Sequence, residues 1–193
     1  MGREFELKYR GSDEAIARLC QDFGGFTTIS METTYYDTFD GKLGSLHWTL
    51  RRRYENGTSI CTLKTPAQGG GRSEWEVEAD DIMTAIPKLC KLGAPDMLTE
   101  LTAGGVTQVC GAKFTRLAKN LEIPEATVEL ALDRGCLMGG GREMALREVE
   151  IEVKSGSEEA AIGFARLLEH QYGLTPEPRS KFRRALGLAK GEF

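Results

Sequence analysis

Charged and apolar residues alternate in several short segments of this 193-residue chain. In the first of these segments, Glu4, Glu6 and Lys8 share one face of an extended backbone, and Phe5 and Leu7 share the other. Clustered carboxylates suit hard, oxygen-binding cations such as Mg2+ and Mn2+. Arginine and lysine suit phosphate oxygens, arginine in a bidentate fashion and lysine as a point charge. Both kinds of charge in one cavity would fit a metal-bound polyphosphate.

The same alternation returns along the chain. The acids at such positions are Glu4, Glu6, Glu74, Glu76, Glu78, Glu129, Asp133, Glu148, Glu150 and Glu152. The cations at such positions are Lys8, Arg51, Arg53, Lys64, Arg72 and Arg116. Any one of these segments could be the solvated face of a sheet. Because the polar faces of many segments carry almost nothing except charged residues, the pattern favours a charged interior that they share. Arg52 and Arg147 have the opposite parity, and we expect them to face outward.

Helix signals are few and clear. Ser12 can cap a helix from Asp13 to about Phe23, and Gly24-Gly25 ends it. Ser157 can cap a second helix, which Gly173 stops. Weaker helical patterns cover residues 81–92, with Pro87 in the middle, and residues 180–190. The remaining chain is expected to be strands joined by glycine-rich turns at Asn56-Gly57, Gly69–Gly71 and Gly139–Gly141.

These elements favour an α+β fold in which the strands close into a barrel. If the apolar strand faces pack outward under helices, the charged faces line the inside. Buried charges persist only when they are paired, solvated or ligated, so a charged interior indicates a binding function. We expect one domain over residues 1–193, with barrel strands in about 3–154 and C-terminal helices in about 157–190.

Bulk properties exclude several classes of protein. The formal net charge is −4, which argues against a nucleic-acid binder that works through bulk charge. No segment has the pattern of a signal peptide or a membrane span, and the five cysteines form no CxxC pair. We therefore expect a cytoplasmic protein with reduced thiols. The two histidines, His47 and His170, are expected to have no direct catalytic role, and Trp48 and Trp75 to lie in the core.

The run Glu4-Phe5-Glu6-Leu7-Lys8 resembles the ExExK signature of the CYTH family, also called the triphosphate tunnel metalloenzymes. Alone this signature is weakly specific, but further motifs follow in the family's order almost to the end of the chain. They are Tyr35-Tyr36-Asp37-Thr38, Leu50-Arg51-Arg52-Arg53, Thr62-Leu63-Lys64, Arg72-Ser73-Glu74, Phe114-Thr115-Arg116, Glu129–Asp133, Glu148–Glu152 and Ser180–Arg184.

The resemblance implies an eight-stranded antiparallel barrel, open as a tunnel and flanked by helices, that binds Mg2+ or Mn2+. The implied metal ligands are Glu4, Glu6, Glu74, Glu129, Asp133, Glu148, Glu150 and Glu152. The residues implied to bind the triphosphate are Lys8, Arg51, Arg53, Lys64, Arg72, Arg116, Lys181 and Arg184, with Arg183 an alternative to Arg184. The residues expected to take part in catalysis are Lys8, Arg53, Lys64 and Glu150.

The run from Glu148 to Gly156 and the Ser180-Lys181 pair are similar to bacterial inorganic triphosphatases. We therefore expect hydrolysis of tripolyphosphate to pyrophosphate and phosphate. The alternatives are a nucleoside or thiamine triphosphatase, a class IV adenylate cyclase, and a polyphosphate-binding module without turnover. Cyclase-type members tend to carry a His-Phe element ahead of ExExK, and here only Met1–Arg3 precede it. Since the chain stops at Phe193, we expect no C-terminal CHAD domain; a homodimer remains open.

Overall fold

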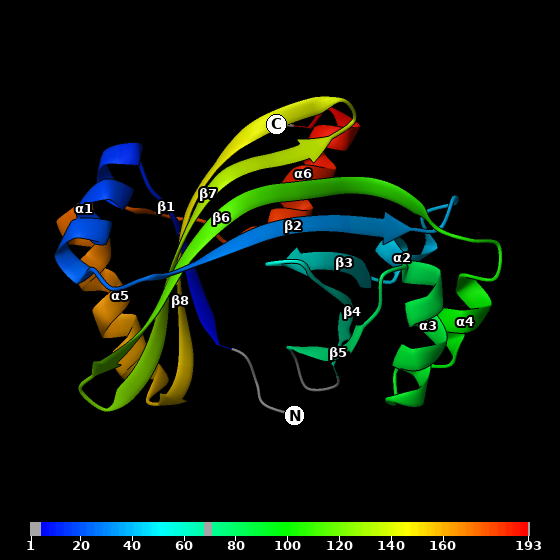
Figure 1. Ribbon diagram of the computed structural model, residues 1–193, viewed down its shortest axis with the longest axis horizontal. Coiled ribbons are helices and arrows are strands. Elements are labelled where there is room, and N and C mark those ends of the chain that lie inside the picture. The colour runs from blue at the N-terminus through cyan, green and yellow to red at the C-terminus, as the bar shows by residue number, and fades with distance from the viewer. Residues whose placement is uncertain (1–4, 68–70, 193) are drawn as a thin grey trace.

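The strands form one antiparallel sheet in a computed structural model that describes residues 5–67 and 71–192. The order across the sheet is β5-β4-β3-β2-β6-β7-β8-β1-β9. The strands are β1 Glu6–Arg10, β2 Thr27–Asp37, β3 Thr49–Glu55, β4 Thr58–Pro66, β5 Arg72–Glu78, β6 Thr107–Ile123, β7 Ala126–Gly139, β8 Arg142–Gly156 and β9 Thr175–Pro176. The sheet curves strongly around an open side (Figure 1).

Within the part of the chain that the structure describes, four of the helices lie where the sequence predicts them, and two short ones, Lys42–Ser45 and Met97–Leu101, are not predicted. They are α1 Asp13–Phe23, α2 Lys42–Ser45, α3 Ile82–Lys91, α4 Met97–Leu101, α5 Glu158–Tyr172 and α6 Lys181–Lys190. The hydroxyls of Ser12, Ser157 and Ser180 each accept a backbone N–H in the first turn of α1, α5 and α6. Pro87 lies inside α3 without ending it. No helix in the described ranges has the length and apolar character to span a membrane.

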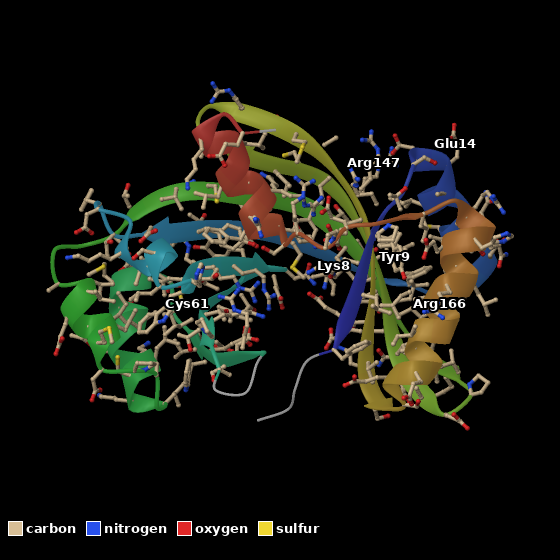
Figure 2. The ribbon with its side chains drawn as sticks, turned by 180° about the vertical axis from the view of Figure 1, so that it is seen from behind. Lys8, Tyr9, Glu14, Cys61, Arg147 and Arg166 are labelled. Atoms are coloured by element: carbon tan, nitrogen blue, oxygen red, sulfur yellow. The ribbon has the colours of Figure 1, made fainter. Side chains whose placement is uncertain are left out.

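Cross-strand register places the charged positions together on one face of the sheet. Lys8 of β1 pairs with Glu150 of β8, and Arg116 of β6 pairs with Asp133 of β7. We call the face that carries these side chains the inner face. Figure 2 shows Lys8 pointing into the concave space while Tyr9, its neighbour in β1, points toward α5. The predicted parity of these strands is therefore confirmed.

Two apolar cores lie on the opposite, outer face. One packs α1 and α5 against β7, β8 and β1, through residues such as Leu19, Leu130 and Ile151. The other packs α3 and α4 against β3 and β4, through residues such as Leu63 and Leu89. Figure 1 shows these two helix pairs at opposite ends of the curved sheet. Trp48 and Trp75 belong to the second core, as predicted.

The third core lies on the inner face, where we expected only charge. Helix α6 packs Ala185 and Leu188 against Phe114 of β6, Leu137 of β7 and Leu146 of β8. The long strands β6, β7 and β8 therefore bury an outer apolar stretch near α5 and an inner apolar stretch under α6. A uniform rule of apolar outside and charged inside cannot describe such strands, because each is covered on different faces at its two ends.

Within the described residues the sheet has nine strands, one more than expected. β1 to β8 are longer strands of the kind predicted, and the ninth is the two-residue β9, which pairs Pro176 with Tyr9 and Thr175 with Arg10. The turns at Asn56-Gly57 and Gly140-Gly141 connect hairpins as predicted. Gly69 and Gly70, the first two residues of the expected turn between β4 and β5, lie outside the described residues.

Candidate active site

Three buried carboxylates converge on the inner face. Asp133 of β7 stands opposite Glu148 of β8 in register, and Glu150 follows Glu148 on the same face. Asp133 and Glu148 are fully buried, and Glu150 is 8% exposed. One carboxylate oxygen from each residue lies within 4.8 Å of those of the other two, which is close enough to share one cation. We call these three residues the carboxylate cluster.

Three cationic side chains balance the charge of the carboxylate cluster. The Lys181 ammonium, from the first turn of α6, lies 2.8 Å from Asp133 Oδ2 and 2.6 Å from Glu150 Oε1, and it also pairs with Glu148. Arg116 donates two hydrogen bonds of 2.8 Å to Asp133 and pairs with Glu150. Arg184, which is 6% exposed, pairs with Glu148. Sequence reasoning left Arg183 and Arg184 open, and the structure places Arg184 inside while Arg183 is exposed.

Burial and these ion pairs shift the pKa values of the neighbouring residues Glu148 and Glu150 in opposite directions. Burial raises the pKa of Glu148 to about 7, with the adjacent Glu150 adding to the effect against the opposing Lys181. Burial acts in the same direction on Glu150, but Lys181 and Arg116 outweigh it and hold its pKa below the usual range. Burial would lower the pKa of Lys181, yet the three carboxylates raise it above the usual range. Glu150 is therefore held as a carboxylate.

More open acids flank the carboxylate cluster on the same face. Glu6 receives a hydrogen bond of 3.0 Å from Lys8, and its side chain is 32% exposed. Glu129 and Glu152 stand opposite each other in register and pair with Lys154 at 3.6 and 3.0 Å. Glu152 also stands opposite Glu6. Glu4 lies outside the described residues.

The basic side chains of β3 and β4 form a second group on the inner face. The side chains of Arg51 and Arg53 in β3 point to the same side of the sheet as that of Lys64 in the neighbouring strand β4. Lys64 pairs with Glu74 at 2.8 Å, and Arg51 lies 3.6 Å from the same residue. The remaining acids of this group are Glu55, which pairs with Arg53 at 2.6 Å, and Glu76, which accepts a hydrogen bond from Thr62.

Donors in this basic group are left unused. The Nε atoms of Arg51 and Arg53 are buried and have no hydrogen-bond partner within the described part of the chain. A buried donor without a partner is costly, and a ligand that accepts the hydrogen bond removes this cost. Burial lowers the pKa of Arg53, and repulsion from Arg51 and Arg116 lowers it further. The three cations of the basic group lie close together but are paired with Glu55, Glu74 and Glu76, so an anionic ligand would bind by replacing some of these pairs.

The basic group and the carboxylate cluster face the same space. Arg116 forms an ion pair with Asp133 of the carboxylate cluster, and its positive charge is close enough to lower the pKa of Arg53. Tyr35 is a buried residue of β2 that belongs to one of the family motifs but for which the sequence predicts no site role. Burial is the main reason why the pKa of Tyr35 is raised, and Arg51 and Lys181 are close enough for both charges to act in the opposite direction. Cross-strand pairing of Tyr35 with Arg51 is the signal that could have placed it on the inner face.

Arg72 behaves differently from the other predicted phosphate-binding residues. It is exposed at the start of β5, and its Nη2 donates hydrogen bonds to the His47 carbonyl at 2.8 Å and to Thr49 Oγ1 at 3.1 Å. Arg52 lies on the outer side, as predicted, where it donates a hydrogen bond to the Asp80 carbonyl. Arg147, also expected to face outward, pairs with Asp13 of α1 at 2.8 Å.

The chain matches the CYTH domain over residues 2–186. It is 26% identical over 200 residues to the inorganic triphosphatase of Haemophilus influenzae, in an alignment that covers all of this chain and 57% of that protein. The chain therefore spans little more than half the length of this curated relative.

Solved structures share the fold. A Hippeastrum protein described as a putative adenylyl cyclase with dominant triphosphatase activity has a TM-score of 0.69 at 19% identity, covering 100% of this chain and 97% of that one. A putative adenylate cyclase from Bacillus halodurans has a TM-score of 0.59 at 18% identity, covering 95% and 98%. With the family match over nearly the whole length, this chain belongs to the CYTH domain family.

Proposed function

We propose that this chain is a divalent-metal-dependent triphosphatase that hydrolyses inorganic tripolyphosphate to pyrophosphate and phosphate. The observation that carries the proposal is the meeting of two groups on one inner face. The carboxylate cluster has three acids close enough to share a cation, and the guanidinium groups of Arg51 and Arg53 lie on the same inner face. A metal-complexed polyphosphate satisfies both groups at once.

The proposal includes a tunnel closed by β1 to β8. The curved sheet brings β1 and β5 to the two sides of its open space (Figure 1). In a closed barrel, Lys8 of β1 would face the basic group on β3 and β4 across the interior. A triphosphate in such a tunnel is surrounded by cations and shielded from bulk water, which strengthens each electrostatic contact.

The oxygens of the carboxylate cluster lie within 4.8 Å of one another and could hold a hard divalent cation, which would replace some of the contacts that Lys181, Arg116 and Arg184 make with them. We infer that Mg2+ or Mn2+ is held by the carboxylate cluster together with Glu4 and Glu6, and that Glu129, Glu152 and Glu74 are further candidate ligands. When bound, such an ion polarises phosphate oxygens and lowers the pKa of a coordinated water. Glu150 is poised to ligate, since Lys181 and Arg116 keep it ionised.

The basic residues bind and orient the substrate. Arg51, Arg53 and Lys64 hold the phosphates from β3 and β4, and Lys8, Arg116, Lys181 and Arg184 hold them from the side of the carboxylate cluster. Positive charge fixed around the terminal phosphoryl group stabilises the charge that develops on it and on the departing pyrophosphate. Arg72, which is exposed and bonded to a backbone carbonyl, would contribute only at the tunnel's edge.

The inner face offers little to recognise a base. Among the described residues, the aromatic rings on this face are Tyr35, Phe114 and Phe182, and all three pack in the core around α6. The Phe182 ring lies 4.9 Å from the Tyr35 ring, centroid to centroid. Tyr35 and Phe114 are buried and Phe182 is partly buried, so the described inner face leaves little aromatic surface for a nucleobase or thiamine ring to stack upon, which favours an inorganic substrate.

Phosphate release from tripolyphosphate, pyrophosphate, ATP and thiamine triphosphate, each with Mg2+ and with Mn2+, tests the proposal. We expect tripolyphosphate to give the highest kcat/KM and pyrophosphate to be poor, because the full set of cations needs three phosphates. A higher kcat/KM for ATP or thiamine triphosphate, or the appearance of cyclic AMP, would favour those alternatives. Tight binding without phosphate release would indicate a binding module.

A further inference from the structure

The segment between α5 and α6 crosses from the outer to the inner face of the sheet. Leu174 is buried in the outer core with α5, and Ser180 caps α6 on the inner face. Between them, β9 pairs with β1 at the edge of the sheet. This connector thus carries the chain around the β1 edge, and its path determines where α6 begins. Lys181 is the first residue of α6.

Glu177 is the buried charge at the centre of this connector. Its side chain is 2% exposed, although it contributes nothing to the carboxylate cluster. Its backbone N–H donates a hydrogen bond of 2.8 Å to the carbonyl of Lys8 in β1. Its carboxylate accepts three hydrogen bonds of 3.0 Å from Arg179, through the backbone N–H, Nε and Nη2. Arg10 of β1 lies 3.5 Å from Oε2.

The electrostatics agree with this geometry. Hydrogen bonds from Arg179 lower the pKa of Glu177 to about 2 against the effect of burial, and the charge of Arg184 on α6 acts in the same direction. Glu177 therefore stays ionised at neutral pH and joins β1 and the residues before α6. Its neighbours Pro176 and Pro178 have fixed φ angles, which limits the conformations of the connector further.

We propose that Glu177 is a positioning residue that fixes the start of α6 and so holds Lys181 and Arg184 over the carboxylate cluster. This inference rests on the proposed function. A rigid link is needed there because Lys181 contacts all three acids of the carboxylate cluster from a helix that reaches them only through this connector. A displacement of about 1 Å in such a group can cost on the order of a hundredfold in rate.

The test compares three variants with the wild type. Glu177→Gln keeps the shape of the side chain and removes its charge, and Glu177→Asp keeps the charge. Asp13→Asn is the matched control, since it removes an ion-paired acid that contacts Arg147 and Arg134 on the outer side and does not touch the connector. The readouts are amide hydrogen exchange of α6 and steady-state tripolyphosphate hydrolysis.

For Glu177→Gln we expect faster exchange in α6, unchanged exchange in α3, and a fall in kcat of roughly ten- to a hundredfold. KM should change less than kcat, because α6 supplies only Lys181 and Arg184 to substrate binding, whereas Arg51, Arg53 and Lys64 bind from strands that the connector does not contact. Glu177→Asp should recover part of kcat, and Asp13→Asn should match the wild type in both readouts.

Unchanged α6 exchange in a folded Glu177→Gln protein would overturn the proposal, as would faster exchange with unchanged kcat. If Glu177→Gln does not fold, the exposed partner is changed instead, and Arg179→Gln must then loosen α6 and lower kcat for the proposal to stand. A wild-type chain that cleaves no triphosphate contradicts the proposed function alone. In that case α6 exchange still decides whether Glu177 holds the helix.

Discussion

Arg52 and Arg53 are adjacent in β3, but their side chains lie on opposite faces of the sheet. Arg53 is on the inner face beside Arg51, and Arg52 donates a hydrogen bond to the Asp80 carbonyl on the outer side. We expect Arg53→Ala to lose about 2–4 kcal/mol of transition-state stabilisation, the range for a preorganised electrostatic group. Arg52→Ala should leave kcat/KM for tripolyphosphate nearly unchanged.

Measuring kcat/KM for both variants gives a comparison within a single strand. Loss of the Arg52 guanidinium removes a contact to Asp80 and a cation–π contact with Tyr54, so a modest fall in melting temperature is expected. Equal losses of activity in the two variants would mean that the inner face is not where the substrate binds.

At the scale of the element, α6 is held closely at its C-terminal half as well as at its start. A Cβ on Gly139 of β7 would lie 2.3 Å from the carbonyl oxygen of Ala185 and 2.8 Å from the backbone nitrogen of Ala189. These are backbone atoms of α6, so the helix cannot yield by rotating a side chain. The close approach of β7 and α6 therefore requires glycine at this position.

We expect Gly139→Ala to destabilise the protein by about 1–3 kcal/mol, the usual cost of overpacking a well-packed contact. Gly163→Ala is the control, because Gly163 is an exposed residue of α5 where a Cβ meets nothing within 4 Å. That substitution should stabilise by roughly 0.4–1 kcal/mol, since alanine favours helix and restricts the unfolded chain. Denaturant melts of both variants measure the difference, and equal effects would contradict the close packing of α6.

At the scale of the whole molecule, the balance of positive and negative charge on the inner face determines whether the protein needs a bound metal to fold. The three acids of the carboxylate cluster are matched by Lys181, Arg116 and Arg184, so the described chain can neutralise them without a bound cation. Folding should then persist in chelator while hydrolysis stops. Added Mn2+ should raise the melting temperature, by the equivalent of about 2.7 kcal/mol at a hundredfold excess over Kd.

The variant Glu6→Gln distinguishes a role of Glu6 as a metal ligand from a role in a structural ion pair. In the structure Glu6 pairs with Lys8 and is partly exposed, and pairs of this kind contribute about 0–1 kcal/mol. The metal-free variant should therefore melt close to the metal-free parent, while the stabilisation by Mn2+ shrinks and activity collapses. A metal-free variant that melts far below its parent, or a parent indifferent to Mn2+, would exclude this metal site.

Local chemistry determined much of this protein from its sequence. The period-two alternation predicts the strands and the face of each charged residue, because successive side chains of a strand point in opposite directions. Serine caps and glycine stops predict α1 and α5 within a residue, because capping involves only neighbouring backbone groups. The family motifs also identify Lys181 as a candidate site residue.

Only the tertiary structure decided which charges meet. Lys181 reaches Asp133 and Glu150 across at least thirty residues of intervening sequence, along a path set by α5 and its connector. No periodicity predicts that α6 covers the inner face, because its apolar side could pack equally well on either face of a sheet. The buried role of Glu177 is likewise invisible in the sequence, since its contacts with Arg10 and with the Lys8 carbonyl arise only when the connector packs against β1. Pairings of this kind depend on how distant segments pack, which local residue preferences do not encode.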